Sequence, residues 1–306
     1  MGFALDQFGV DLTARAVAGR LDPVFGRERE IGRVIRVLSR KTKNNPVLLG
    51  EPGVGKTAVV EGLAQRIASG EVPGALGGLS VFSLNLGSLL AGTGYRGDFE
   101  KRLELLVAEL RRPGTRRILF VDELHLLCRA GKSEGGLDAG NLLKPLLARG
   151  ELPCVGASTP SEWRELTEAD PALERRFQPV SVPEPSVSET LDILRALRSR
   201  FEDHHEVEIA DEALEAAIAG SSAPDRRLPD RAIDLLDEAC ALVRLSRKGA
   251  GSEELESARR ALAHATERFD LNEVARLRRH LAAALRNQPR PAVDATAVSL
   301  ASATWA

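Results

Sequence analysis

The chain has 306 residues, a formal net charge of −2, 43% apolar residues and 28% charged residues. This length corresponds to about two domains of ordinary size and allows a substantial core without support from disulfides or metal ions. The apolar content excludes a disordered chain, and no apolar run approaches the ~20 residues of a membrane span. The near-zero net charge argues against a dedicated nucleic-acid binder. Because residues 1–10 lack a signal-peptide pattern, we expect a cytoplasmic protein that does not associate with membranes.

The first two-thirds of the chain alternates between short apolar runs and helical patterns. The runs are too short for helices and are bounded by glycine or polar residues, which favours strands. Between them, apolar residues recur at helical spacing, for example from Ile31 to Leu38 and from Phe99 to Leu110. Strands separated by helices predict an α/β fold, with a parallel sheet covered on both faces. The predicted strands are Val47–Leu49, Val81–Leu84, Ile118–Val121, Pro153–Gly156 and Pro179–Val182.

A stiff connection at Pro183–Pro185 suits a domain boundary, and beyond it we predict only helices. The first helix begins at a capping box formed by Ser186 and Glu189. The second begins at Asp211, and the third begins after Pro229. We therefore expect two domains, an α/β domain over residues 1–183 and a small helical domain over residues 184–248.

A glycine-rich break at Gly249–Ser252 separates a third region, residues 249–306. Residues 253–286 are rich in Ala, Leu and Arg, with a predicted turn at Phe269–Asn272, which favours two helices paired as a hairpin. Its apolar residues recur at helical spacing and could bury a face against the neighbouring domain or against a partner. We interpret the rest of the region as a linker tail.

A complete phosphate-binding motif, the P-loop, follows the first predicted strand and opens a helix. The glycines let backbone N–H groups surround phosphates, and the helix N-terminus adds a positive dipole. Lys56 is expected to reach the β- and γ-phosphate oxygens, and Thr57 to ligate Mg²⁺. This context disfavours the alternative of a glycine-rich turn with a surface lysine. The predicted nucleotide-binding residues are Gly50, Glu51, Pro52, Gly53, Val54, Gly55, Lys56, Thr57 and Ala58.

Two acidic residues follow the predicted strand Ile118–Val121. Asp122 is placed to orient the Mg²⁺ shell, and Glu123 to polarise the attacking water as a general base. Such pairs often cap helices, but a position after a buried strand downstream of a P-loop favours ATP hydrolysis. ATP and Mg²⁺ are therefore the expected cofactors. The histidines and cysteines show no spacing typical of a metal site.

Several longer segments lie outside the P-loop: Leu21–Arg27, Asn44–Val47, Val60–Ala64, Tyr95–Glu100, Asp138–Asn141, Leu173–Phe177 and Leu228–Asp230. Together with the P-loop they resemble the first ATPase module of Clp-type AAA+ unfoldases, over about residues 5–247. The resemblance implies a P-loop NTPase sheet flanked by helices and a small helical lid domain. It also implies a hexameric ring of identical subunits that binds ATP between neighbours and pulls protein chains through a central pore.

The resemblance assigns roles to single residues. Thr159 matches the sensor that contacts the γ-phosphate or the attacking water. Arg175 and Arg176 match arginine fingers, which neutralise charge on the phosphoryl group bound by a neighbouring subunit. Without the remaining pattern, a solvated arginine pair at a helix end would be the simpler interpretation. The residues expected around the adenine are Val24, Phe25, Ile193 and Leu194.

The only tyrosine of the chain, Tyr95, matches the pore-loop aromatic of the family. It stands on a glycine-flanked segment, where an amphipathic ring can grip a passing chain without reading its sequence. A lone tyrosine is more often a half-buried packing residue, so this expectation comes from the resemblance. We expect Tyr95 and its neighbour Arg96 to contact the protein substrate.

The chain departs from the family in its extent. Relatives usually carry a domain before this module and a second ATPase module after it, and residues 297–305 resemble the start of that second module. The hairpin resembles the short middle domain of ClpC-type members, whereas ClpB-type members carry a much longer coiled coil. It is the expected surface for adaptor proteins.

Two other functions remain open from the sequence. The first is an ATP-dependent, ring-forming scaffold that recruits partners and unfolds little by itself. The second is a DNA-directed AAA+ motor, suggested by the abundance of arginine but opposed by a nearly equal number of acids.

Overall fold

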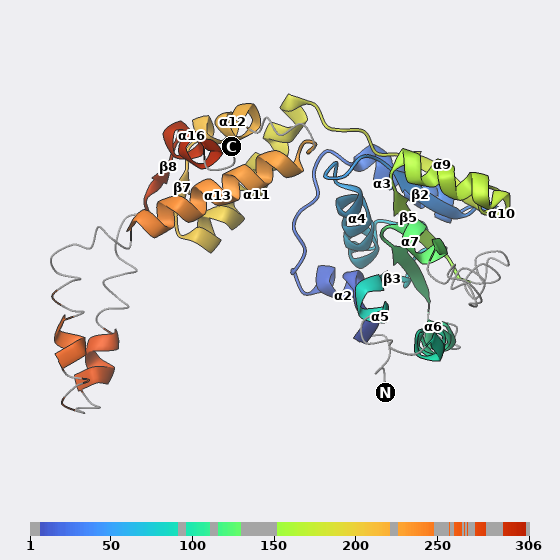
Figure 1. The fold of residues 1–306 in the computed structure, drawn as a ribbon, viewed down its shortest axis with the longest axis horizontal. Coiled ribbons are helices and arrows are strands. Elements are labelled where there is room, and N and C mark those ends of the chain that lie inside the picture. Colours follow the sequence, from blue (N-terminus) through green and yellow to red (C-terminus); the bar gives the residue numbers. More distant parts are fainter. Residues whose placement is uncertain are drawn as a thin grey trace. The chain divides into compact units, whose positions relative to one another are not determined.

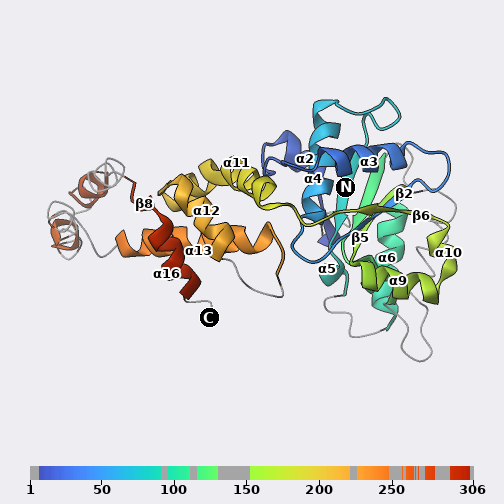
Figure 2. The same ribbon diagram turned by 90° about the horizontal axis from the view of Figure 1, so that it is seen from above.

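The computed structural model describes residues 7–90, 96–110, 116–129, 152–220, 226–247 and 290–303, together with positions 257, 260–264, 266, 268 and 273–279. The chain divides into two compact units (Figures 1 and 2). The first unit comprises residues 1–193 and 225–230, and the second comprises residues 194–224 and 231–306. No helix among the described residues is both long enough and apolar enough to cross a membrane.

The first unit contains a six-stranded sheet with the strand order β1-β3-β4-β5-β2-β6. All neighbours pair in parallel except β1, which runs antiparallel to β3. The predicted parallel α/β sheet is confirmed, and each predicted apolar run overlaps one strand. Only β1 was not predicted, because three residues with a central valine give no strand pattern. The bounds are Gly9–Asp11 (β1), Asn45–Leu49 (β2), Ser80–Leu84 (β3), Arg117–Val121 (β4), Cys154–Ser158 (β5) and Phe177–Ser181 (β6).

Helices cover both faces of this sheet, as Figure 2 shows for α3 and α4 on one side and α6 and α9 on the other. Because side chains alternate along a strand, Leu48 packs into one core and Val47 into the other. The first core contains α2 (Leu12–Val17), α3 (Glu28–Leu38) and α4 (Lys56–Ser69). The second contains α5 (Leu86–Leu90), α6 (Arg96–Leu110), α7 (Leu124–Arg129), α9 (Pro160–Ala169) and α10 (Pro171–Glu174).

In the second core, α7 packs close to β5. Gly156 of β5 and Leu124 of α7 are both buried, and a Cβ added to Gly156 would lie 2.8 Å from Leu124 Cδ2. A side chain at position 156 would therefore push α7 away from the sheet. This close packing places the start of α7 against the middle of β5.

Helices dominate the chain after Pro185, as predicted. The capping box at the start of α11 is confirmed, with Ser186 N–H donating to Glu189 Oε2 at 2.8 Å and Glu189 N–H donating to Ser186 Oγ at 3.2 Å. The helices expected at Asp211 and after Pro229 are also present. The helix bounds are Val187–His205 (α11), Asp211–Gly220 (α12), Asp230–Arg247 (α13) and Ala295–Ala303 (α16).

The prediction of helices alone is wrong in one respect, since the second unit contains two short strands. Glu208–Ile209 (β7) pairs in parallel with Ala292–Val293 (β8), and α16 packs against α12. Strands of two residues have no detectable period, so no pattern in the sequence could predict them. Residues 260–264 and 273–279 of the predicted hairpin are helical, whereas its predicted turn lies outside the described residues.

We expect Gly156→Ala to lower the free energy of unfolding by about 1–3 kcal/mol, because the added methyl group overpacks the contact with Leu124. The measurement is a urea titration followed by circular dichroism. Gly74→Ala is the control, since a Cβ at Gly74 would meet nothing within 4 Å. Equal stabilities of the two variants would contradict the close contact between α7 and β5.

Candidate active site

The P-loop connects β2 to α4 and depends on its glycines. Gly53 and Gly55 have φ values of 81° and 94°, in the left-handed region that favours glycine. Gly50 is constrained by space, because a Cβ there would lie 2.5 Å from the carbonyl oxygen of Val182. Between them, Val54 is buried and anchors the loop in the core, while Glu51 and Pro52 are exposed. The loop therefore has one well-defined path, which ends at the first turn of α4.

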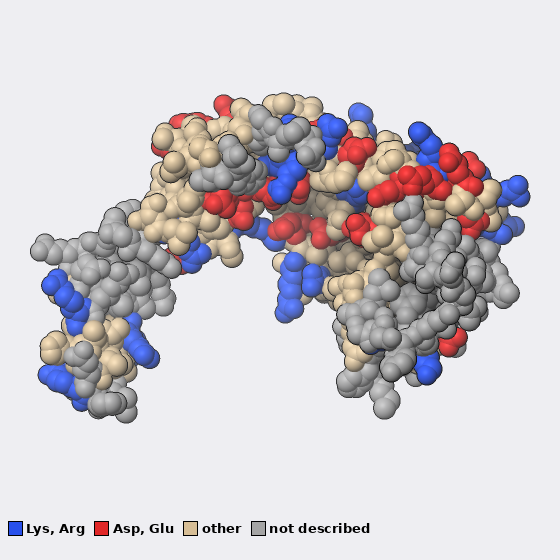
Figure 3. Space-filling model, in the orientation of Figure 1, with Lys and Arg blue, Asp and Glu red and all other residues tan. Residues whose placement is uncertain are grey.

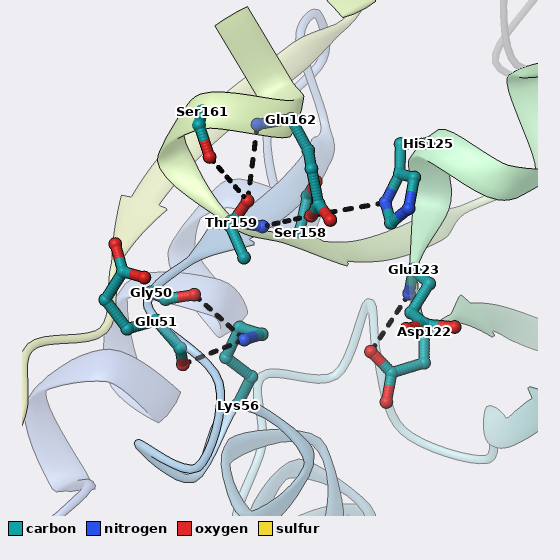
Figure 4. A network of polar contacts seen from close by, with 10 residues as sticks. All are labelled: Gly50, Glu51, Lys56, Asp122, Glu123, His125, Ser158, Thr159, Ser161 and Glu162. Carbon is teal, nitrogen blue, oxygen red and sulfur yellow. Dashed lines mark hydrogen bonds and ion pairs between the residues drawn. The ribbon is translucent and has the colours of Figure 1, made fainter. Parts of the chain in front are cut away.

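Lys56 begins α4 and turns its ammonium group back over the loop (Figure 4). Its Nζ donates to the carbonyl oxygens of Gly50 at 2.8 Å and Glu51 at 3.0 Å. Burial lowers the pKa of Lys56, and the negative charge of Asp122 acts in the opposite direction. The contacts with Gly50 and Glu51 hold the ammonium group at the mouth of the P-loop, where a phosphate would bind.

Thr57 and Asp122 face each other across the site. The Thr57 hydroxyl donates to Asp122 Oδ2 at 3.3 Å, and Asp122 Oδ1 accepts the N–H of Glu123 at 3.0 Å. Glu123 has a φ of 52°, which is uncommon outside glycine and marks a sharp turn between β4 and α7. Its side chain is exposed. The structure thus places Thr57 beside Asp122.

The donor set at this point fits Mg²⁺. A hydroxyl and a carboxylate are hard oxygen ligands, and Mg²⁺ keeps several waters and phosphate oxygens in its shell, so it needs few protein ligands. Among the described residues, no group of three or more His, Cys, Asp or Glu could hold a different metal ion. Thr57 and Asp122 are a candidate pair of ligands for Mg²⁺.

Thr159 follows β5 and caps α9. Its hydroxyl oxygen accepts the N–H of Glu162 at 3.2 Å and lies 3.1 Å from the Ser161 hydroxyl. Since β5 lies between β4 and β2 in a parallel sheet, Thr159 lies between the acidic pair and the P-loop. Figure 4 shows Lys56, Asp122 and Thr159 around one space. The structure thus brings these predicted site residues together.

Arg27 is a site residue to which the sequence analysis gave no role. Its side chain is buried, and its Nη2 donates to the carbonyl oxygens of Val54 at 2.6 Å and Pro183 at 3.0 Å. Burial lowers the pKa of this guanidinium, and the charge of Glu30, whose carboxylate lies 3.8 Å away, partly offsets the effect. The only signal in the sequence was its place in the segment Leu21–Arg27.

The bond from Arg27 orients part of the P-loop. In a trans peptide the C=O and the following N–H point in opposite directions. Because Arg27 holds the carbonyl of Val54, the N–H of Gly55 points away from the guanidinium. This N–H and those of the first turn of α4 are the donors that a phosphate can use.

Other predicted residues have less defined surroundings. Val24 packs partly buried against the core beside α4, and Phe25 is 44% exposed. Ile193 and Leu194 are consecutive in α11, the first half-buried and the second fully buried in the second unit. Ala58 is half-buried in the first turn of α4. Binding of adenine by these residues stays a prediction.

The two candidate arginine fingers are exposed directly after α10. Within the described part of the chain, neither Arg175 nor Arg176 makes a side-chain hydrogen bond or ion pair. Tyr95 lies outside the described residues. Arg96 begins α6, and its side chain is likewise outside the description.

Two protein-family models match the chain. The model described as "ATPase family associated with various cellular activities (AAA)" matches residues 46–180, and the model described as "AAA lid domain" matches residues 186–287. The first match spans β2 to β6, and the second begins just before α11.

Curated relatives include the chaperone protein ClpB of Vibrio vulnificus, which is 59% identical over 244 residues. The ClpB of Meiothermus ruber is 58% identical over 245 residues. Each alignment covers 79% of this chain, but only 28% and 29% of the respective relative. The chain therefore spans less than a third of the length of these curated relatives.

Solved structures agree. One, described as "Closed State CryoEM Reconstruction of Hsp104:ATPyS and FITC casein", matches with a TM-score of 0.77 and 41% identity, covering 99% of this chain and 46% of that one. An Hsp104–ADP complex from S. cerevisiae matches with a TM-score of 0.74 and 50% identity, covering 80% and 42%. The family models, the curated relatives and the solved structures all point to the same family. The chain belongs to the Clp-type AAA+ ATPases.

Proposed function

We propose that this chain hydrolyses ATP and serves as a motor module of a ring-forming protein unfoldase in the cytoplasm. The observation that carries the proposal is the pairing of Thr57 with Asp122 at 3.3 Å, beside Lys56 and Thr159. Three neighbouring parallel strands end at this point, so their following residues share one edge of the sheet. Hydrogen-bond donors for phosphate, oxygen ligands for a cation and a carboxylate base would thereby lie side by side.

In the proposed reaction, the P-loop N–H groups and Lys56 bind the phosphates of ATP. Thr57 and Asp122 would hold Mg²⁺, which when bound neutralises charge on the phosphate oxygens. Glu123 accepts a proton from the attacking water as the water oxygen bonds to the γ-phosphorus. The bond to the β-phosphate oxygen breaks, and ADP leaves. Thr159 is placed to hold the water or the γ-phosphate in line.

Two substitutions separate binding from hydrolysis. We expect Lys56→Ala to abolish ATP binding, because it removes the charge at the mouth of the P-loop. We expect Glu123→Gln to retain binding and lower kcat by about 10²–10⁴-fold, because the amide cannot accept the proton. Binding is measured by calorimetry and turnover by phosphate release, with the exposed Lys41→Ala as control. Undiminished turnover by Glu123→Gln would remove Glu123 as the base.

Assembly into a ring is proposed from the exposed arginines and from the relatives. Arg175 and Arg176 present their charge outward, as fingers for a neighbouring subunit require. The Hsp104 structures were solved with nucleotide or with casein, and their shared fold supports protein substrates for this chain as well. We also propose that the 253–286 hairpin binds adaptor proteins. The proposed domain boundaries lie at residues 183 and 248.

The arginine assignment predicts complementation between subunits. Arg175→Ala/Arg176→Ala is expected to lower kcat by about 10³–10⁵-fold with little change in ATP affinity. Mixing this variant with Glu123→Gln should restore turnover, because one chain supplies the fingers and the other the base. Phosphate release is measured against total protein concentration. A mixture as inactive as its components, or turnover independent of concentration in a proven monomer, would overturn the assignment.

Threading of a protein substrate is tested at Tyr95, the proposed pore contact with Arg96. We expect Tyr95→Ala to abolish ATP-driven unfolding of a tagged fluorescent protein while ATP turnover persists. Tyr95→Phe, which keeps the ring, should retain unfolding. If the unsubstituted chain hydrolyses ATP but unfolds nothing, the ring-forming scaffold is the better interpretation.

A DNA-directed motor has less support. On the face shown in Figure 3, Asp and Glu side chains lie among the Lys and Arg side chains over most of the described surface, and only the small region at the lower left shows basic side chains alone. A nucleic-acid track requires a continuous basic surface along the phosphate backbone.

A further inference from the structure

Glu162 gathers several polar groups beside the proposed hydrolytic site (Figure 4). Its Oε2 accepts the N–H of Thr159 at 3.0 Å and the hydroxyl of Ser158 at 3.3 Å. The same oxygen lies 3.3 Å from Nδ1 of His125 in α7. One carboxylate therefore contacts both the turn that carries the proposed sensor and the helix that follows the proposed base.

This arrangement exceeds an ordinary helix cap. A capping box requires two bonds, and Glu162 and Thr159 already supply both. Burial alone would raise the pKa of Glu162, but the Thr159 hydrogen bonds, the Ser158 hydroxyl and His125 outweigh it and hold the pKa below its ordinary value of 4.5. The carboxylate is therefore charged at neutral pH, and its charge also acts on Lys56.

His125 completes the connection to the segment that carries the base. It is buried, and within the described chain its Nδ1 has no aligned hydrogen-bond partner, although Glu162 lies within ion-pair distance. His125 stands two residues after Glu123 and directly after Leu124, which packs against Gly156 of β5. A shift of the turn after β4 would therefore change the contact between His125 and Glu162.

The cap also fixes the orientation of Thr159. Its hydroxyl oxygen accepts the N–H of Glu162 at 3.2 Å and lies 3.1 Å from the Ser161 hydroxyl, so the side chain is held in one orientation. A sensor hydroxyl must face a water or a phosphate oxygen in a fixed direction. A threonine without the cap could occupy other rotamers.

We propose that Glu162 is a positioning residue for hydrolysis, which holds Thr159 and, through His125, the segment bearing Glu123 in one mutual arrangement. The inference rests on the proposed ATP hydrolysis. Glu162 itself does not touch the substrate in this proposal, and it acts on the reaction only through the geometry of the sensor and the base.

The first test compares two substitutions that each remove one carboxylate from a helix start while keeping a capping side chain. Glu162→Gln is expected to lower kcat at least about tenfold, with KM within about threefold, because the sensor and the base lose their common anchor. Asp294→Asn is the control. Asp294 accepts the N–H of Ala297 at 2.9 Å at the start of α16, and its substitution should leave kcat within about twofold.

A double-mutant cycle with Thr159→Ala tests whether Glu162 acts through the sensor. If it does, Glu162→Gln lowers kcat less in the Thr159→Ala background than in the unsubstituted chain, because only the arm through His125 is left to lose. Effects on kcat that multiply, or a kcat of Glu162→Gln equal to that of Asp294→Asn, would overturn the proposal. Lack of turnover by the unsubstituted chain would instead overturn the proposed function on which it rests. Melting temperatures measured in parallel identify any variant that fails to fold.

Substitution of His125 tests the second arm and remains informative if Glu162→Gln does not fold. Asn places an amide N–H donor near the position of Nδ1, whereas Leu fills a similar volume without a donor. We expect His125→Leu to lower kcat and His125→Asn to restore most of it, at similar melting temperatures. Equal kcat values for the two variants would overturn the role of His125 as the connection.

Discussion

The site depends on the parallel alignment of β2, β5 and β4. Parallel strands in one sheet end at the same edge, so the residues that follow them meet even though they are far apart in the chain. β2 leads into the P-loop, β4 into the acidic pair and β5 into Thr159. Two cores hold the strands in this register, because alternate side chains of each strand are buried on opposite faces. The chemistry at the edge thus follows from packing inside the sheet.

Backbone constraints make that edge suitable for phosphates. Gly53 and Gly55 adopt left-handed φ values, and the buried Arg27 holds the carbonyl of Val54 so that the next N–H turns away from it. Burying a guanidinium costs free energy that hydrogen bonds must offset, and the carbonyls of Val54 and Pro183 provide them. The same arginine thereby contacts the P-loop and the proline-rich connection ahead of α11. A helix N-terminus and a lysine then add the positive charge that an anion requires.

Local sequence patterns predicted most of the fold and the main members of the site. The apolar runs became β2 to β6 because short apolar segments between turn signals are too short to form buried helices. Shorter elements were missed: β1, β7 and β8 owe their structure to the strand that each pairs with. The same holds for the side chains. The motif spacing identified Lys56 and Asp122, whereas the contact of His125 with Glu162 joins two segments that no local pattern relates.

The amino-acid sequence alone indicated a nucleotide-binding site, because a P-loop and an acidic pair after a buried strand need only local order to be recognised. It also determined the family, through segments that span both the sheet and the helices. The side chains packed around this site could be identified from the three-dimensional structure alone. Arg27 contacts Val54 and Pro183, and His125 contacts Glu162, all of them distant in sequence, since burial and hydrogen bonding depend on what the fold packs beside each group.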